Sequence, residues 1–113
     1  MPNEFGMYDN AYNSLRRRFP AEDGWEIEER PAYSGYSPDY AIERRRRGTV
    51  ERVVVEVKDT DRVTNVHIDQ LNRYVRNLSG GNVRIVAKFL IVPSGCDCSS
   101  IVGGDIEVIY LRG

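Results

Sequence analysis

The stretch RIVAKFLIV, residues 84–92, is nearly continuous in apolar side chains, and it constrains the fold more than any other feature. The run is too short to cross a bilayer. An apolar run of this length is typical of a β-strand that other elements cover on both faces of a sheet. We therefore expect residues 84–92 to form such a strand, with the rest of the chain supplying layers on both sides of it.

Two helices are predicted. The first has a stripe of apolar residues three and four positions apart, and Pro20 ends it after a basic last turn. The stripe consists of Phe5, Tyr8, Tyr12, Leu15 and Phe19. The second helix covers roughly residues 66–78, with Thr64 or Asn65 as its cap and a Ser-Gly-Gly sequence at its end. Its buried stripe is predicted to contain Ile68, Leu71, Val75 and Leu78.

Four further segments have the alternation or the β-branched content of strands: residues 24–30, 39–45, 49–58 and 105–111. The second and third are joined around Arg-Arg-Gly and are expected to form an antiparallel hairpin. The order helix, three strands, helix, strand, strand predicts an α/β fold, an α/β/α sandwich with a central mixed β-sheet. The crossover through the second helix predicts that strands 49–58 and 84–92 are parallel.

The length and composition indicate one globular domain over residues 1–113. The chain has no linker or internal repeat, and its charged fraction of 29% and hydrophobic fraction of 41% are typical of such a domain. No secretory signal and no membrane-spanning run is visible in the sequence. We therefore expect a cytoplasmic protein without a membrane partner.

The charge of the chain is unevenly distributed, although the formal net charge is only -1. All of its 16 basic residues except Lys58 and Lys88 are arginine, with clusters at residues 16–18 and 44–47. Such clusters can contact phosphates even on a neutral protein. The alternative interpretation is a solvated helix end and a solvated turn. The single histidine, His67, is expected at the surface and not as a general base.

Cys96 and Cys98 lie in one short loop between two predicted strands. Two thiols this close seldom reach good disulfide geometry with each other. Two thiolates also supply only half of a zinc or iron–sulfur site, so a metal there would need a second chain. We interpret the two cysteines as loop thiols.

Two carboxylates and an ammonium are predicted to converge at one end of the hairpin. Strand alternation places Glu56 and Lys58 on the same face of strand 49–58. Asp39 begins the partner strand, and the turn lies midway between them, so Asp39 returns to the same end. Neighbouring carboxylates repel each other unless a divalent cation lies between them, and oxygen ligands suit Mg²⁺. The alternative interpretation is an ordinary strand with charges facing water.

Gln70 and Tyr74 are four positions apart on the second helix and share one face, offset from its buried stripe. A crossover helix packs on the sheet, so Gln70 is expected to lean over the carboxylates. The alternative interpretation is a polar helix position followed by a half-buried tyrosine.

These residues resemble a known superfamily. Pro38-Asp39 followed by Glu56-Val57-Lys58 across a hairpin resembles the PD-(D/E)xK nuclease superfamily of restriction-endonuclease-like domains. The sequence from Gln70 to the tyrosine four residues later is similar to the QxxxY element of RecB-type exonuclease domains. The resemblance covers roughly residues 15–92, and its specificity lies in the order and spacing of the motifs together.

The resemblance implies a restriction-endonuclease-like core, with the order αβββαβ, and an enzymatic activity. Asp39, Glu56 and the main-chain carbonyl of Val57 would hold one or two Mg²⁺ ions, for which Mn²⁺ would substitute. Lys58 would position or activate the attacking water, and Gln70 would support Lys58 or the water. The reaction would be in-line hydrolysis of a phosphodiester bond of DNA, leaving a 5′-phosphate and a 3′-hydroxyl.

Contacts with nucleic acid are also expected, because the hairpin tip would lie next to a nuclease cleft. The residues expected to touch DNA are Tyr74, Arg45, Arg46 and Arg73. Tyr74 would touch the nucleic acid or brace the helix, and it would not react. Many nucleases of the superfamily add an acidic ligand from the first helix, for which Glu4 and Asp9 are the candidates.

The chain departs from RecB-type domains, because it is shorter and lacks their four-cysteine cluster. Its size is similar to that of the small archaeal Holliday junction resolvases, which resemble this fold and act as dimers. One site per chain would require two copies to cut two strands, so a homodimer is one hypothesis. A partner protein that supplies specificity is another.

Two alternatives to a nuclease stay open at this point. The chain would be a non-catalytic nuclease-fold subunit that binds or scaffolds within a nucleic-acid-processing complex, or an unrelated α/β domain whose charges are merely exposed. Divalent metal binding separates the unrelated domain from the nuclease. Turnover separates the nuclease from the non-catalytic subunit.

Overall fold

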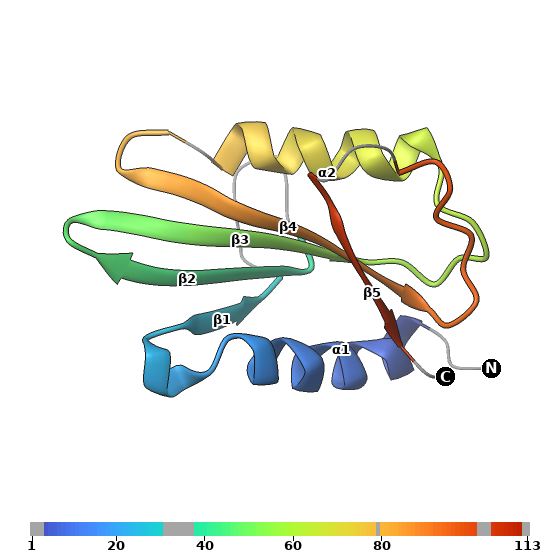
Figure 1. Ribbon diagram of the computed structural model, residues 1–113, viewed down its shortest axis with the longest axis horizontal. Helices are drawn as coiled ribbons and strands as arrows, with labels where there is room; N and C mark the ends of the chain where they lie inside the picture. The colour runs from blue at the N-terminus through green and yellow to red at the C-terminus, as the bar shows by residue number, and fades with distance from the viewer. Residues whose placement is uncertain (1–3, 31–37, 79, 102–104, 112–113) are drawn as a thin grey trace.

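The computed structural model describes residues 4–30, 38–78, 80–101 and 105–111, without the side chains of residues 4–8 and 78. The described chain is an α/β fold with a five-stranded mixed sheet and two α-helices (Figure 1). In chain order the elements are α1 (Glu4–Arg18), a short 3-10 helix η1 (Ala21–Asp23), β1 (Glu26–Glu29), β2 (Tyr40–Arg46), β3 (Thr49–Val57), α2 (Asn65–Leu78), β4 (Val83–Pro93) and β5 (Glu107–Leu111).

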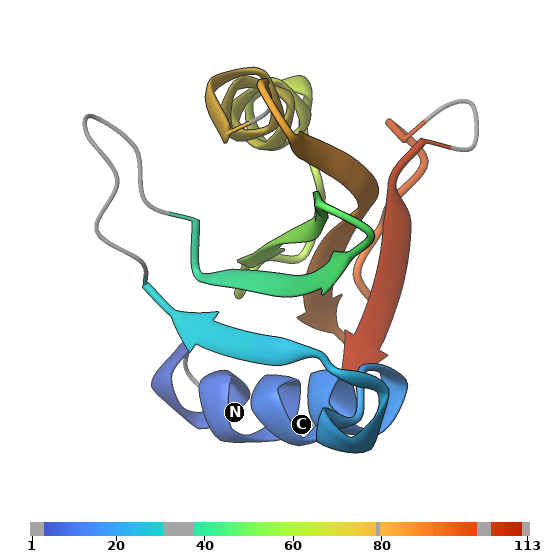
Figure 2. The ribbon, with the colours of Figure 1, turned by 90° about the vertical axis from the view of Figure 1, so that its left-hand side faces the viewer.

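The strands lie in the order β1-β2-β3-β4-β5 across the sheet. The pairs β1–β2 and β2–β3 are antiparallel, whereas β3–β4 and β4–β5 are parallel. The parallel pairing of β3 with β4, which α2 connects, confirms the predicted crossover. The two helices lie on opposite faces of the sheet, an arrangement compatible with a sandwich (Figure 2).

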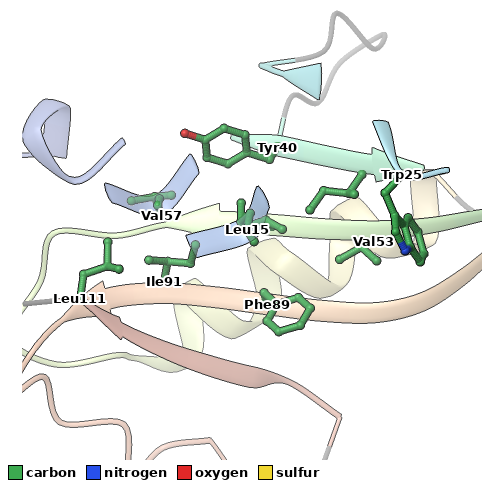
Figure 3. Packing of buried hydrophobic residues seen from close by; sticks show 11 residues of the cluster. Leu15, Trp25, Tyr40, Val53, Val57, Phe89, Ile91 and Leu111 are labelled. Carbon is green, nitrogen blue, oxygen red and sulfur yellow. The ribbon is translucent and has the colours of Figure 1, made fainter. Parts of the chain in front are cut away.

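Alternation along β3 divides the interior into two parts. One set of alternate residues packs in the larger core against α1: Val53, Val55 and Val57 (Figure 3). Val54 points to the other face, where it packs with Leu71 and Tyr74 of α2. Full burial of a valine or leucine contributes roughly 1.5–3 kcal/mol, so packing on both faces fixes β3 in place. Glu56, two positions after Val54, shares the α2 face, as predicted from the alternation.

β4 is covered on both faces only in its second half. There Phe89 and Ile91 pack on the α1 side, while Leu90 and Val92 belong to a separate cluster on the α2 side. The first half extends past the end of α2 (Figure 1), and Val86 is 41% exposed. The expectation of a strand covered along its whole length is therefore wrong for this half.

Val86 is a β-bulge in the pairing of β4 with β3. Arg52 pairs with Ile85, but the next residue of β3, Val53, pairs with Ala87. The extra residue breaks the alternation of β4. Residues before the bulge therefore face the side opposite to the one that unbroken alternation would give them.

The turn between β2 and β3 is built from two left-handed residues. Arg47 has φ of 51° and Gly48 has φ of 81°. Two consecutive residues of positive φ are typical of a type I′ turn, whose twist matches that of the flanking strands. The strand residues on either side, Arg46 and Thr49, are paired.

The register set by this turn decides which residues meet at the open end of the hairpin. Tyr40 is opposite Val55, so the next pair along the ladder places Asp39 opposite Glu56. A slip of one residue would send Asp39 to the other face of the sheet.

Parts of the sequence-based prediction fall on residues whose structure is not described. The side chains of Phe5, Tyr8 and Leu78, and the loop predicted at residues 31–37, lie outside the described residues. Within the described chain, no helix is long and apolar enough to span a membrane.

We expect Gly48→Ala to lower the free energy of unfolding by about 1 kcal/mol, because the left-handed conformation costs an L-residue roughly 1–2 kcal/mol. A Cβ atom on Gly48 would meet no atom within 4 Å, so backbone strain is the cost. Arg47→Asn is the matched control, because asparagine tolerates positive φ. Its free energy of unfolding should equal or exceed that of the wild type. Urea unfolding measures both, and an unchanged stability of Gly48→Ala would contradict the turn type.

Candidate functional site

Asp39 and Glu56 meet at the open end of the β2–β3 hairpin. The main-chain N–H of Asp39 donates a hydrogen bond to Oε1 of Glu56 at 3.0 Å. In return, the main-chain N–H of Val57 donates to Oδ2 of Asp39 at 2.7 Å. Each carboxylate is therefore held by the main chain of the opposite side of the hairpin, and the structure brings the two sequence-predicted acids together.

Lys58 lies at the first position after β3, beside Glu56. Its Nζ lies 3.5 Å from Oε2 of Glu56, and its side chain is 25% exposed. The main-chain N–H of Lys58 donates to the carbonyl of Ile91 in β4 at 2.9 Å, which continues the sheet ladder. The ammonium thus contacts the carboxylate of Glu56 and also reaches solvent.

Glu56 is the only charged residue that is buried within the described part of the chain, with an exposed fraction of 4%. Burial and, after it, the negative charge of Asp39 raise the pKa of Glu56, Lys58 partly offsets both, and the resulting pKa is about 7. At neutral pH its carboxyl group is therefore near its titration midpoint. Such a shift, caused by burial beside a like charge, is common at functional sites.

The donor set fits a hard divalent cation. Asp39 and Glu56 supply carboxylate oxygens, the ligands that Mg²⁺ prefers. The carbonyl of Val57 lies on the same side of β3 as its N–H, which bonds Asp39, because the N–H and C=O of one strand residue point to the same neighbour. The described residues contain no group of three or more His, Cys, Asp or Glu that could hold a metal. A cation bound here would therefore take its further ligands from a main-chain carbonyl and from water.

Tyr74 of α2 lies near this site, and Gln70 contacts Tyr74. The side-chain amide of Gln70 donates to the hydroxyl oxygen of Tyr74 at 3.0 Å. Burial raises the pKa of Tyr74, and the charge of Glu56 raises it further, which places the phenol within the field of the buried carboxylate. The structure thus brings the two helix residues to the same face of the sheet as Glu56.

Tyr74 is nevertheless more deeply buried than the helical pattern predicts. Its exposed fraction is 7%, and its ring packs with Val54 and Leu71 in the α2-side core. The expectation of a position offset from the buried stripe is therefore wrong. A ring in the core has little surface on which a base could stack, so the arrangement favours bracing of the helix.

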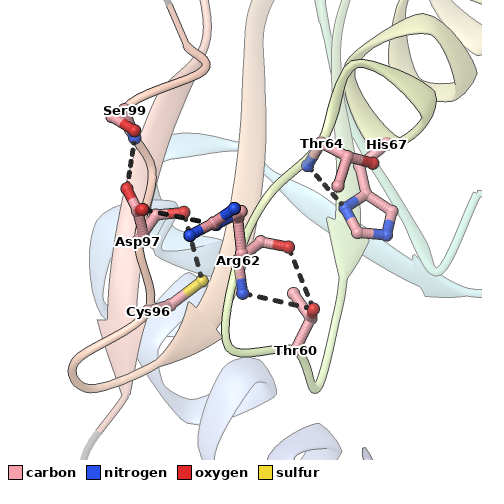
Figure 4. Close-up of polar contacts among 7 residues, drawn as sticks. All are labelled: Thr60, Arg62, Thr64, His67, Cys96, Asp97 and Ser99. Atoms are coloured by element: carbon pink, nitrogen blue, oxygen red, sulfur yellow. Dashed lines mark hydrogen bonds and ion pairs between the residues drawn. The ribbon is translucent and has the colours of Figure 1, made fainter.

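Figure 4 shows how the segment after Lys58, residues 59–64, is tied to the loop after β4. The N–H of Val63 donates to the carbonyl of Asp97 at 2.9 Å, and the N–H of Asp97 donates to the carbonyl of Asp61 at 2.8 Å. The guanidinium of Arg62 also lies 3.5 Å from a carboxylate oxygen of Asp97. These contacts hold the connection between the lysine and α2.

His67 is half-buried in the first turn of α2. Its Nδ1 accepts a hydrogen bond from the N–H of Thr64 at 3.1 Å (Figure 4). Burial lowers the pKa of His67, and the positive charge of Lys58 lowers it further, so the ring is neutral at physiological pH. The thiols of Cys96 and Cys98 are both free, as expected for loop cysteines, and Cys96 is buried.

The predicted nucleic-acid contacts lie at two separate places. Arg73 is exposed on α2 and lines a surface hollow of about 350 Å³ together with Val66, Asp69 and Gln70. This hollow lies beside Gln70, on the same helix as Tyr74.

The arginines of the hairpin, in contrast, are far from the carboxylates. Arg45 and Arg46 are exposed near the tip, at the opposite end of β2 from Asp39. With a rise of about 3.3 Å per strand residue, roughly 20 Å separates Arg46 from Asp39. The structure therefore does not bring the hairpin tip next to the site, and the two arginines face opposite sides of the sheet.

The first helix contributes no carboxylate to the described site. Burial and the nearby charges of Glu29, Asp39 and Asp9 together raise the pKa of Tyr40 to about 12. Asp9 belongs to α1, which packs on the face of the sheet opposite to the α2 face of Glu56. The side chain of Glu4 lies outside the described residues.

Sequence and structure comparisons add nothing to this geometry: no family model, no curated protein and no solved structure matches the chain. The interpretation of the site therefore depends on the residues themselves.

In the absence of metal, removing the charge of Glu56 should stabilise the folded protein at high pH. The pKa of Glu56 in the folded chain, about 7, exceeds its ordinary value of 4.5, so stability falls as pH rises between these values. One pKa unit corresponds to about 1.4 kcal/mol. We therefore expect the free energy of unfolding of Glu56→Gln to exceed that of the wild type by on the order of 3 kcal/mol above pH 7, and to match it near pH 4. Urea unfolding in chelator measures the difference.

Glu51→Gln is the control with the opposite sign. The hydrogen bond from Arg44 lowers the pKa of Glu51, so its charge contributes stability above the ordinary pKa, and this contribution is lost as pH falls. The wild type should therefore be the more stable protein at neutral pH, and the difference should close in acid. A Glu56→Gln variant that is less stable than the wild type at pH 8 would contradict the burial of an ionised carboxylate.

Proposed function

We propose that this protein is a Mg²⁺-dependent nuclease with a restriction-endonuclease-like core of the PD-(D/E)xK type, and that it hydrolyses phosphodiester bonds of DNA. The observation that carries the proposal is the contact between Asp39 and Glu56 across the hairpin, with Nζ of Lys58 3.5 Å from the second carboxylate. The helix, three strands, helix and strand that begin the chain are compatible with such a core.

Asp39 and Glu56 would bind Mg²⁺, or Mn²⁺ in its place, through carboxylate oxygens, and the carbonyl of Val57 would be a further ligand. A divalent ion bound there would stabilise the attacking and leaving oxygens of an in-line displacement. The burial of Glu56 supports this role, because its attraction for a cation is screened less than that of an exposed carboxylate. Binding of the cation would also remove the repulsion between the two acids.

Lys58 would position or activate the attacking water. Its side chain contacts Glu56 on one side and is open to solvent on the other, which is where a water and a phosphate would approach. Gln70 would support the lysine or the water from α2. The new bond would form between the water oxygen and phosphorus, and the bond from phosphorus to the 3′ oxygen would break, leaving a 5′-phosphate and a 3′-hydroxyl.

A second candidate function is a non-catalytic subunit that keeps the same fold. The observation that favours it is the hydrogen bonding of the acids. Both Asp39 and Glu56 accept main-chain hydrogen bonds that close the end of the hairpin, so they also have a structural role. In this case the chain would bind or scaffold within a nucleic-acid-processing complex.

Metal binding is the first test. We expect calorimetry to show saturable Mg²⁺ or Mn²⁺ binding to the wild type, weakened at least tenfold by Asp39→Asn and by Glu56→Gln. Binding should also weaken as pH falls below 7, because protons compete for Glu56. Glu28→Gln is the control, since it removes an exposed carboxylate of β1. Equal binding by all four proteins would exclude a metal site at the hairpin.

Cleavage is the second test, on single-stranded, linear duplex and branched DNA with RNA in parallel. Lys58→Met should fold and bind metal, yet lose cleavage by a factor of about a hundred or more, as is typical for the loss of a group that acts in proton transfer. Metal binding by the wild type without cleavage of any substrate would instead favour the non-catalytic subunit.

Tyr74→Phe tests the support from α2. The ring stays in the core, so the free energy of unfolding should change by about 1 kcal/mol or less, the value of one hydrogen bond. The hydroxyl that positions Gln70 is removed, so kcat should fall while the KM for DNA stays nearly constant. A rise in KM alone would indicate that Tyr74 contacts nucleic acid, and Gln70→Ala should reproduce the loss of kcat.

The assembly of the protein stays a prediction. A homodimer would give two sites for two strands, and a partner protein would supply specificity. Sedimentation showing only monomer at tens of micromolar would count against the homodimer, and it would leave the metal site and the reaction untouched.

A further inference from the structure

Three arginines surround one carboxylate at the hairpin end of the sheet, and we name Arg44, Arg46, Arg84 and Glu51 the arginine cluster. Glu51 in β3 lies directly opposite Arg44 in β2 and Arg84 in β4. Arg46 pairs with Thr49, two positions before Glu51, so it is a diagonal neighbour. Nε of Arg44 donates to Oε1 of Glu51 at 2.8 Å.

The cluster lies on the α1 face of the sheet. The guanidinium of Arg44 sits 4.3 Å from the centre of the Trp25 ring, which belongs to the core beneath α1. The hydrogen bond from Arg44 lowers the pKa of Glu51, and the charges of Arg44, Arg46 and Arg84 lower it further. The three arginines therefore act on one carboxylate from one side of the sheet.

This cluster carries uncompensated positive charge, because three arginines face one glutamate. Arg44 is already paired with Glu51 and packed on Trp25. Arg46 and Arg84 are exposed, and neither forms an ion pair within the described part of the chain. The last turn of α1, which is basic, lies toward the same end of the molecule (Figure 1).

The opposite face of the same hairpin is balanced. There Arg52 pairs with Glu43, and Glu43 lies directly opposite Glu26 of β1. With Arg45, this face has two arginines against two glutamates, and a hollow of about 560 Å³ lies among them. Strand alternation therefore divides the charged residues of the hairpin between the two faces of the sheet, and the α1 face has the excess of positive charge.

We propose that the arginine cluster binds the phosphate backbone of nucleic acid, with Arg46 and Arg84 as the contacting residues and Arg44 as a positioning residue. Guanidinium groups bind phosphates through paired hydrogen bonds, and an excess of fixed positive charge attracts a polyanion. The cluster faces away from Asp39 and Glu56 and lies roughly 20 Å from them along the hairpin. Its binding therefore does not require turnover at the carboxylates.

Fluorescence anisotropy with a labelled DNA duplex and a labelled single strand, in chelator so that neither is cut, tests the proposal. The double variant Arg46→Ala/Arg84→Ala should bind the duplex about tenfold more weakly. The slope of log K against log salt should become shallower by about 0.9 for each phosphate that the variant no longer neutralises. Arg45→Ala is the matched control. The sequence pattern groups Arg45 with Arg46 as a DNA contact, but the structure places Arg45, which is also exposed, on the balanced face, so the affinity of this variant should stay within about twofold of the wild type.

Three results would overturn the proposal. The first is a wild type that binds neither DNA nor RNA, and the second is an effect of Arg45→Ala as large as that of Arg46→Ala/Arg84→Ala. The third is binding of a poly-glutamate peptide at the same arginines without binding of nucleic acid, which would identify an acidic protein as the partner. Arg46→Lys/Arg84→Lys keeps the charge and should keep most of the salt dependence, so it separates an effect of charge from a failure to fold.

The binding test of the arginine cluster and the cleavage test of the proposed nuclease can succeed or fail independently. Nucleic-acid binding that depends on Arg46 and Arg84, in a protein that never cleaves, supports the cluster and contradicts the nuclease. Cleavage that depends on Asp39, together with nucleic-acid binding that does not depend on Arg46 and Arg84, supports the nuclease and contradicts the cluster.

Discussion

The hydrogen bonds exchanged between Asp39 and the end of β3 are the interaction on which the site depends. Where the regular ladder of the hairpin ends, side-chain oxygens accept hydrogen bonds from main-chain N–H groups, so the ladder continues by one step through two carboxylates. The acids are consequently positioned by the sheet itself. The sheet is in turn fixed by Val55 and Val57, which are fully buried against α1. Packing on one face of the sheet thereby holds the carboxylate of Glu56 on the other.

Placing Glu56 in this position is unfavourable for the isolated chain, because its charge is buried beside that of Asp39. Two features offset the cost. The N–H of Asp39 and the ammonium of Lys58 each contact one of its oxygens, and the valine-rich core supplies far more stability than one buried carboxyl removes. The stability of the core thus allows the buried carboxylate of Glu56 to stay in a position where a cation would stabilise its negative charge.

How far the sequence predicts this arrangement depends on which rule each residue obeys. Strand alternation is strict, so the faces of Val53 and Glu56 and the convergence of Asp39 could be predicted from the sequence. The depth of Tyr74 could not, because an amphipathic helix leaves its rotation about its axis open by a fraction of a turn. The distance between the hairpin arginines and the acids follows from strand length, which a motif does not encode. The side on which Arg84 lies was hidden by the bulge at Val86.

The bulge at Val86 also determines how the charges near the hairpin end are distributed between the two faces of the sheet. Ile85 packs toward α2 and Ala87 toward α1, although two residues that are two positions apart on a regular strand share one face. The bulge at Val86 therefore reverses the facing of the side chains between the two parts of β4. If the same sequence paired regularly, without a bulge, Arg84 would lie opposite Val50, on the face of Arg52, and not opposite Glu51. The bulge therefore decides on which face of the sheet this cation lies, for one and the same set of side chains. The way this strand pairs, as much as its composition, sets which face of the hairpin end carries the excess of positive charge.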